Sequence, residues 1–194
     1  LIGFAHFVLG NRLLWVGKLD EAEEELRTAI HIAEQIGYTT LLVRSLMFLP
    51  FIFRRRQQVE EVRSIITRAQ TMPEARNIAV IKGHHAWIAW RDGDMAEAVS
   101  AGLASAGTQQ REQRINAFRW TGLWPVIGVM LMQGKIDEAI DYARMMLTPS
   151  QQLLPEDLCM RLDAALRAWD EGQQEEACKL LQQAVPLAKE LGYL

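Results

Sequence analysis

The sequence is poor in cysteine: it contains only Cys159 and Cys178. Both are expected at the starts of the two antiparallel helices of one helical hairpin, so they would lie toward opposite ends of it. Because a disulfide requires Cα atoms within about 7 Å of each other, we expect two free thiols. Reduced thiols fit a cytoplasmic protein.

Long hydrophobic runs and an excess of basic residues are also missing. The longest apolar stretches are Leu1–Val16, which polar residues interrupt, and Gly122–Met132, whereas a membrane span needs about 20 apolar residues. The net charge of −3 lacks the basic character of a nucleic-acid binder. With 49% hydrophobic and 23% charged residues, the composition is that of a folded globular protein. We therefore expect neither membrane insertion nor direct nucleic-acid binding.

Motifs that carry chemistry are absent as well. The glycines do not form a phosphate-binding loop, and no G-x-S-x-G, C-x-x-C or H-x-x-x-H spacing occurs. His84 and His85 are adjacent, so on a helix their side chains point about 100° apart and do not make a metal site. We predict a protein without catalytic residues, cofactor or metal.

What the sequence does contain is an internal repeat. A turn residue, a polar pair, acidic residues and an alanine recur in four clear copies and one degenerate copy: Gly17–Ala22, Gly93–Ala98, Gly134–Ala139, Gly172–Ala177 and Gln57–Val62. The last positions of the copies, 22, 62, 98, 139 and 177, are 40, 36, 41 and 38 residues apart. The glycine suits the left-handed end of one helix, and the acidic residues suit the start of the next. The final alanine lets two helices approach closely.

Apolar residues at three- and four-residue spacing flank each copy, which predicts an all-α fold. We expect first helices over 2–16, 39–55, 75–91, 112–133 and 156–171, and second helices over 19–36, 58–70, 94–106, 136–147 and 174–191. The five repeats are then 2–36, 39–70, 75–106, 112–147 and 156–191. Because one hairpin cannot bury its apolar faces alone, we expect a single array over 1–194.

These features resemble the tetratricopeptide repeat family. Its pattern of a small residue followed twelve positions later by alanine is matched by Gly10 with Ala22, by Ala86 with Ala98 and by Ala165 with Ala177. Ile127 departs from the pattern, and the spacing exceeds the usual 34 residues. The resemblance implies a right-handed α-solenoid of about five antiparallel helical hairpins that binds a protein or peptide partner without catalysing a reaction.

A narrower resemblance is to the helical sensor arrays of large bacterial regulators, and the segment Ala29–Leu42 carries it. It implies a ligand-sensing arm of a transcriptional regulator or of a signal-transduction ATPase or cyclase, with a small-molecule effector and with domains of the same chain as partners. Ala188–Tyr193 echoes Ala33–Tyr38, and the first residue is Leu. We therefore expect a fragment of a longer protein.

In such a solenoid the first helices line a concave groove, and counting back 18, 15, 11, 8 and 7 residues from each anchor position predicts the side chains in it. The residues chosen from this set are Phe7, Asn11, Trp15, Arg44, Met47, Phe51, Arg54, Arg55, Trp87, Trp90, Arg91, Trp124 and Trp169. The same rule also selects Phe4, Gly128, Leu131 and Met132. Tryptophan and arginine are enriched at binding hot spots. The alternative is that the tryptophans only pack the core.

Three functions stay open from the sequence. The first is a binding module that holds a partner in the aromatic-rich groove. The second is the ligand-sensing arm, and the third is a structural or self-associating module that dimerises through its solenoid ends.

Overall fold

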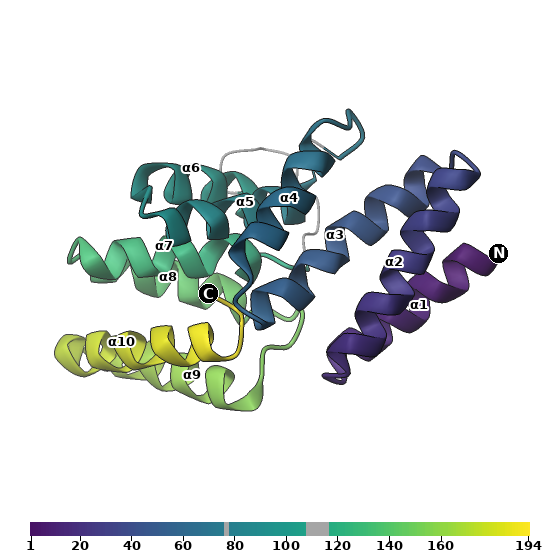
Figure 1. Ribbon diagram of the computed structural model, residues 1–194. Helices are drawn as coiled ribbons and strands as arrows, with labels where there is room; N and C mark the ends of the chain where they lie inside the picture. Colours follow the sequence, from purple (N-terminus) through teal and green to yellow (C-terminus); the bar gives the residue numbers. More distant parts are fainter. Residues whose placement is uncertain (76–77, 108–116) are drawn as a thin grey trace. The chain divides into compact units, whose positions relative to one another are not determined.

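A computed structural model describes residues 1–75, 78–107 and 117–194, and within them every regular element is an α-helix (Figure 1). The all-α prediction is confirmed for these residues. The helices are α1 (Ile2–Trp15), α2 (Leu19–Gln35), α3 (Thr39–Arg55), α4 (Val59–Gln70), α5 (Ala79–Asp92), α6 (Met95–Ala106), α7 (Trp120–Met132), α8 (Ile136–Met146), α9 (Glu156–Asp170) and α10 (Gln174–Glu190). None of these helices is long and apolar enough to cross a membrane.

Eight helices begin and end within one residue of the expected positions. The exceptions are the starts of α5 and α7. Residues 76–77 and 112–116 of the expected helices lie outside the described residues, but 75 and 117–119 form turns, so the prediction is wrong there. The backbone N–H of Gln152 donates to the Ala117 carbonyl at 2.8 Å, and that of Arg119 donates to Oε1 of Gln151 at 3.0 Å. The segment before α7 is therefore bonded to a distant loop, and these bonds replace a helical turn.

The repeated turn has the expected conformation. Each clear copy begins with a glycine at positive φ, namely Gly17, Gly93, Gly134 and Gly172, and Gln57 takes φ of 58° in the degenerate copy. The anchors at the other end of the phrase are completely buried: Ala22, Val62, Ala98, Ala139 and Ala177. A small or β-branched residue at this point brings the second helix close to the first.

The chain divides into two compact units, and each is described by itself. The N-terminal unit, Leu1–Ile81, contains α1 to α4, in which each helix packs on the next and α1 also packs on α3. The C-terminal unit, Lys82–Leu194, contains most of α5 and all of α6 to α10. There α6 packs on α7, α7 on α8, α8 on α9 and α9 on α10, and α10 also contacts α7. One continuous array over 1–194 stays a prediction.

Two buried glycines bring α6 and α7 into backbone contact. A Cβ atom added to Gly102 would lie 2.6 Å from the carbonyl oxygen of Gly122, and one added to Gly122 would lie 2.8 Å from the carbonyl oxygen of Gly102. Both distances are far shorter than a van der Waals contact. The atoms that would clash belong to the backbone, so they could move only if the helices moved apart. The packing of α6 on α7 therefore depends on the absence of side chains at these positions.

We expect Gly102→Ala to lower the free energy of unfolding by about 1–3 kcal/mol, because overpacking of the contact outweighs the gain of about 1 kcal/mol in helix propensity. Denaturation by urea, followed by circular dichroism, measures this change. The matched control is Ser100→Ala on the exposed side of α6, which should change stability by no more than about 0.5 kcal/mol. Stabilisation by Gly102→Ala would show that α6 and α7 do not approach so closely.

Candidate functional site

The predicted groove residues of the N-terminal unit meet along α1 and α3 as a row of aromatic rings. Ring centroids are 6.0 Å apart between Phe4 and Phe7, 5.6 Å between Phe7 and Phe48, 5.9 Å between Phe48 and Phe51, and 5.6 Å between Phe51 and Trp15. We call these five rings the aromatic face. The tilted and edge-on geometries are those that aromatic pairs prefer. Phe7, Phe48 and Phe51 are buried, so Phe4 and Trp15, at the two ends of the row, are the rings that keep part of their surface exposed.

An arginine lies against each end of the aromatic face. The guanidinium carbon of Arg44 is 5.7 Å from the centroid of Phe4, and that of Arg55 is 5.4 Å from the centroid of Trp15. Both distances fall in the range of cation–π contacts. Nη1 of Arg55 also donates to the carbonyl oxygen of Leu14 at 2.6 Å, which orients this cation at the C-terminal end of α1.

The helices that build this face carry no carboxylate. Neither α1 nor α3 contains Asp or Glu, although the chain has 24 such residues. Within the described residues, Arg44 and Arg55 have no ion pair with a carboxylate; their recorded partners are an aromatic ring and, for Arg55, the Leu14 carbonyl. The aromatic face is thus positively charged at both ends in a chain of net charge −3.

The predicted residues differ in their access to solvent. Arg44 is exposed, whereas Asn11, Trp15, Met47 and Arg55 are half-buried, as is Phe4. Phe7 and Phe51 lie beneath them in the core, and the Arg54 side chain is completely buried. Phe48 was not predicted, but its position three residues before Phe51 on the same helix is the signal that could have placed it beside that ring.

The predicted tryptophans of the C-terminal unit also differ in their exposure to solvent. Trp87 and Trp124 are 0% exposed, so they pack the core in this structure. Arg91 places its guanidinium 5.3 Å from the centroid of Trp87. Trp90 and Trp169 are half-buried.

Trp90 forms part of an open hollow of about 380 Å³ in the C-terminal unit. Four of its lining residues come from positions that the counting rule selects, on α5 and α7, and two come from α10; they are Trp90, Gly128, Leu131, Met132, Gln182 and Val185. A Cβ atom on Gly128 would lie 2.6 Å from Cη2 of Trp90, so this glycine lets the indole lie flat on α7. Gln182 is the one polar side chain of the lining.

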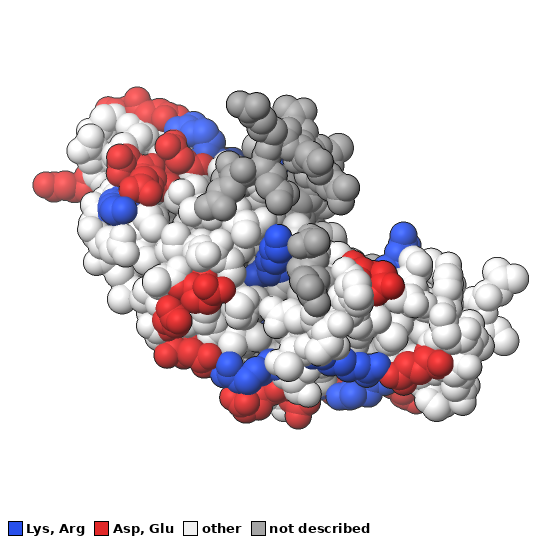
Figure 2. All heavy atoms as spheres, turned by 90° about the horizontal axis from the view of Figure 1, so that it is seen from above, with Lys and Arg blue, Asp and Glu red and all other residues white. Residues whose placement is uncertain are grey.

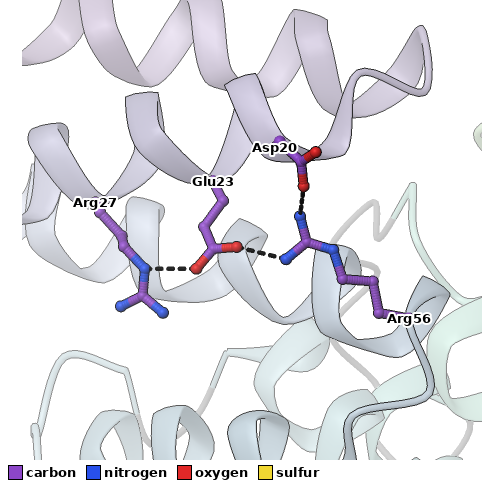
Figure 3. Close-up of polar contacts among 4 residues, drawn as sticks. All are labelled: Asp20, Glu23, Arg27 and Arg56. Carbon is purple, nitrogen blue, oxygen red and sulfur yellow. Dashed lines mark hydrogen bonds and ion pairs between the residues drawn. The ribbon is translucent and has the colours of Figure 1, made fainter.

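A network of ion pairs joins α2 to the end of α3 (Figure 3). Arg56 donates to Oδ1 of Asp20 and to Oε2 of Glu23, both at 2.5 Å, and Nε of Arg27 donates to Oε1 of Glu23 at 2.7 Å. Arg27 also lies over the Phe53 ring, at 5.6 Å from its centroid. Since Arg56 directly follows Arg55, the network holds the end of α3 that carries one cation of the aromatic face.

Opposite charges also lie close together elsewhere on the surface. In the view of Figure 2, Lys and Arg side chains lie next to Asp and Glu side chains along the lower edge. Ion pairs of this kind include Arg63 with Glu60 at 3.2 Å and Arg144 with Asp170 at 2.8 Å. Exposed pairs of this kind contribute little to stability.

The network perturbs the pKa of Glu23. Partial burial raises the pKa of this carboxyl, but hydrogen bonds from Arg56 and Arg27 outweigh it and hold the pKa below its ordinary value of 4.5. A carboxyl with a lowered pKa in the folded state stabilises the fold above its unfolded pKa. This contribution is lost as the pH falls below about 4.5 and through the folded pKa.

We therefore expect Glu23→Gln to lower stability at pH 7 and to flatten the loss of stability below about pH 4.5, since Gln cannot be protonated there. Urea denaturation between pH 7 and pH 3 measures both effects. Glu24→Gln is the matched control, because the neighbouring Glu24 is exposed and outside the network. Two results would show that the network does not couple α2 to α3. One is that Glu23→Gln loses as much stability below pH 4.5 as the unaltered chain does, and the other is that Glu24→Gln changes stability as much as Glu23→Gln does.

The described residues contain no group of three or more His, Cys, Asp and Glu side chains placed to hold a metal ion. The N-terminal unit has the aromatic face with its two arginines, and the C-terminal unit separately has the apolar hollow. Comparisons of the chain with models of protein families, with curated proteins and with solved structures found no match. The tetratricopeptide resemblance stays a prediction, and function must be argued from these residues.

Proposed function

We propose that this chain is a non-enzymatic binding module, built of tetratricopeptide-like hairpins, that holds a protein or peptide partner on the aromatic face. Support for the repeat comes from the turn phrase, with its residue at positive φ and its buried anchor position. Further support is the packing of consecutive helices on one another from α1 to α4 and from α6 to α10.

The observation that carries the proposal is the pair of half-exposed rings at the ends of the row, Phe4 and Trp15, each with an arginine against it. The buried rings between them hold the two in place. Rings offer apolar contact at low conformational cost, and arginine makes bidentate hydrogen bonds with carboxylates. The partner that this surface fits carries apolar side chains between acidic ones. Charge complementarity adds specificity and speeds association, so binding should weaken as the salt concentration rises.

We expect a peptide of about ten residues, in which leucine and phenylalanine alternate with glutamate, to bind the chain more tightly than the same peptide with lysine in place of glutamate. Arg44→Glu should weaken this binding about tenfold or more, and Trp15→Phe should remove the change in fluorescence that accompanies it. Isothermal titration calorimetry gives the affinities, and tryptophan emission reports on the ring.

The matched control is Arg161→Glu, the same change of charge at an exposed position of α9. It should leave the affinity unchanged. Equal affinity for the two peptides, or an equal loss in both arginine variants, would contradict binding at the aromatic face.

The hollow beside Trp90 favours a second candidate function, the small-molecule sensing arm of a larger regulator. Its volume of about 380 Å³ falls in the range of small-molecule sites, and one amide among apolar side chains is enough to orient a ligand. A bound aromatic ring would lie against the part of the Trp90 indole that faces the hollow.

For this candidate we expect 2-naphthol to bind saturably and to change tryptophan emission. Val185→Phe should reduce the affinity about tenfold, because the added ring occupies part of the hollow. Gln183→Phe introduces the same ring at an exposed position of α10 that does not line the hollow, and it should have no effect. If the two variants bind the probe alike, the hollow is not its site.

A further inference from the structure

A second hollow lies in the N-terminal unit between α2 and α4, which both pack on α3. We call it the α2–α4 hollow. Its volume of about 320 Å³ falls in the range of small-molecule sites. Leu46 and Leu49 of α3 lie at its bottom and are 1% exposed, while Ile30 and Ile65 beside them keep 8% and 9% of their surface exposed. Only a narrow apolar strip therefore faces the hollow, which suits a small apolar body.

Arginine and glutamate side chains surround this strip, and three of the four are in ion pairs. Nε of Arg27 donates to Oε1 of Glu23 at 2.7 Å, within the network that joins α2 to the end of α3 (Figure 3). Arg68 of α4 forms an ion pair with Glu34 of α2, which joins the two walls of the hollow. The fourth is Glu61 of α4, which has no ion pair or hydrogen bond within the part of the chain that the structure describes. Among these four charges the unpaired one is thus negative.

Glu61 is placed to accept hydrogen bonds from a ligand. It lies in the first turn of α4, where its charge interacts favourably with the helix dipole, and neither of its oxygens accepts a hydrogen bond from a described residue. Ser64, three residues later, lies on the same side of α4, and His31 lies on the opposite wall. Both are exposed and have no hydrogen bond to another described residue. A ligand therefore meets a carboxylate, a hydroxyl and an imidazole beside an apolar strip.

The same residues argue against an anionic ligand. Arg27 and Arg68 already pair with carboxylates of the chain, which an anion would have to displace. It would also meet the like charge of Glu61, which opposes binding, whereas an ammonium group makes a charge-assisted hydrogen bond with a carboxylate. The available length is limited as well, since Glu61 and Arg68 are seven residues apart, or about 10 Å along a helix.

We propose that the α2–α4 hollow binds a small primary amine in its protonated form. The ammonium group donates to the carboxylate of Glu61, a short arm passes Ser64, and an apolar ring lies on the strip that Ile30 and Ile65 leave exposed. This site does not depend on the proposed function, because none of its lining residues belongs to the aromatic face or to the hollow beside Trp90.

The probe is 2-phenylethylamine, a cation with one ring and a two-carbon arm, and isothermal titration calorimetry of the whole chain measures its affinity. The matched probes are 2-phenylethanol and 3-phenylpropanoate, which carry the same ring with a neutral or a negative end group. We expect the amine to bind saturably, one molecule per chain, and about tenfold more tightly than either matched probe. A higher salt concentration should weaken binding of the amine.

Glu61→Gln should lower the affinity for the amine about tenfold, to that for the alcohol. The matched control is Glu60→Gln, the same change at the preceding residue, which is exposed and does not line the hollow. It should bind the amine as the unaltered chain does. Because both glutamates are exposed, circular dichroism should show the same helix content in the two variants.

Three further variants test where the ring lies. Ser64→Phe should weaken binding of the amine and of the alcohol about tenfold, because the added ring occupies part of the hollow. Thr67→Phe adds the same ring at an exposed position of α4 outside the lining, and it should have no effect. Val185→Phe, which obstructs the hollow beside Trp90, should also leave binding of the amine unchanged.

Three results would overturn the proposal. The first is that the amine does not bind, or that it binds no more tightly than the alcohol or the carboxylate. The second is that Glu61→Gln and Glu60→Gln weaken binding equally, which would mean that the net charge of the chain, and not this site, attracts the amine. The third is that Val185→Phe weakens binding as much as Ser64→Phe does, which would place the amine in the other hollow.

Discussion

The close approach of a second helix to the first helix before it, as in α1 with α2, α3 with α4, α7 with α8 and α9 with α10, is the constraint on which the other features depend. It requires a residue that adopts positive φ at the turn and a small or β-branched residue at the anchor position. Both requirements are met at Gly17 with Ala22 and also at Gln57 with Val62, where the sequence departs from the pattern. With the start of each second helix fixed in this way, helical spacing decides which residues of the first helix can face solvent. The half-exposed rings of Phe4 and Trp15 are one result of that decision.

The repeated turn is also followed by acidic residues at the start of the next helix. Acidic residues gather in the first turns of the second helices, as in α2, α4 and α8, where they interact favourably with the helix dipole. The first helices α1, α3 and α7 carry none, and α5 has only Asp92 at its end. In the N-terminal unit, α1 and α3 therefore carry rings and no carboxylate, and α2 and α4 carry carboxylates. The first helix α9 departs from this division, since Glu156 and Asp157 lie in its first turn. Pairing across this division, as between Arg56 and Glu23, then stabilises the packing of α2 on α3.

The sequence predicts helices well because their signals are local. The turn phrase and the apolar spacing gave both ends of α3 correctly. The start of α7 could not be predicted, because residues 117–119 are bonded to Gln151 and Gln152, which lie more than 30 positions away. The tryptophans show the same limit. Spacing gives the direction of Trp87, Trp90 and Trp124 relative to their own helices, but burial depends on what packs over them, and only Trp90 retains solvent contact.

In the proposed function, the aromatic face should recognise its partner by direction more than by contact area. It has few accessible atoms, because Phe7, Phe48 and Phe51 are buried. The guanidinium groups of Arg44 and Arg55 nevertheless lie against Phe4 and Trp15, at 5.7 and 5.4 Å from the ring centroids, and the bond from Arg55 to the Leu14 carbonyl holds that cation in place. Because cations in fixed positions favour a partner with carboxylates at matching positions, selectivity there should come from the placement of charge.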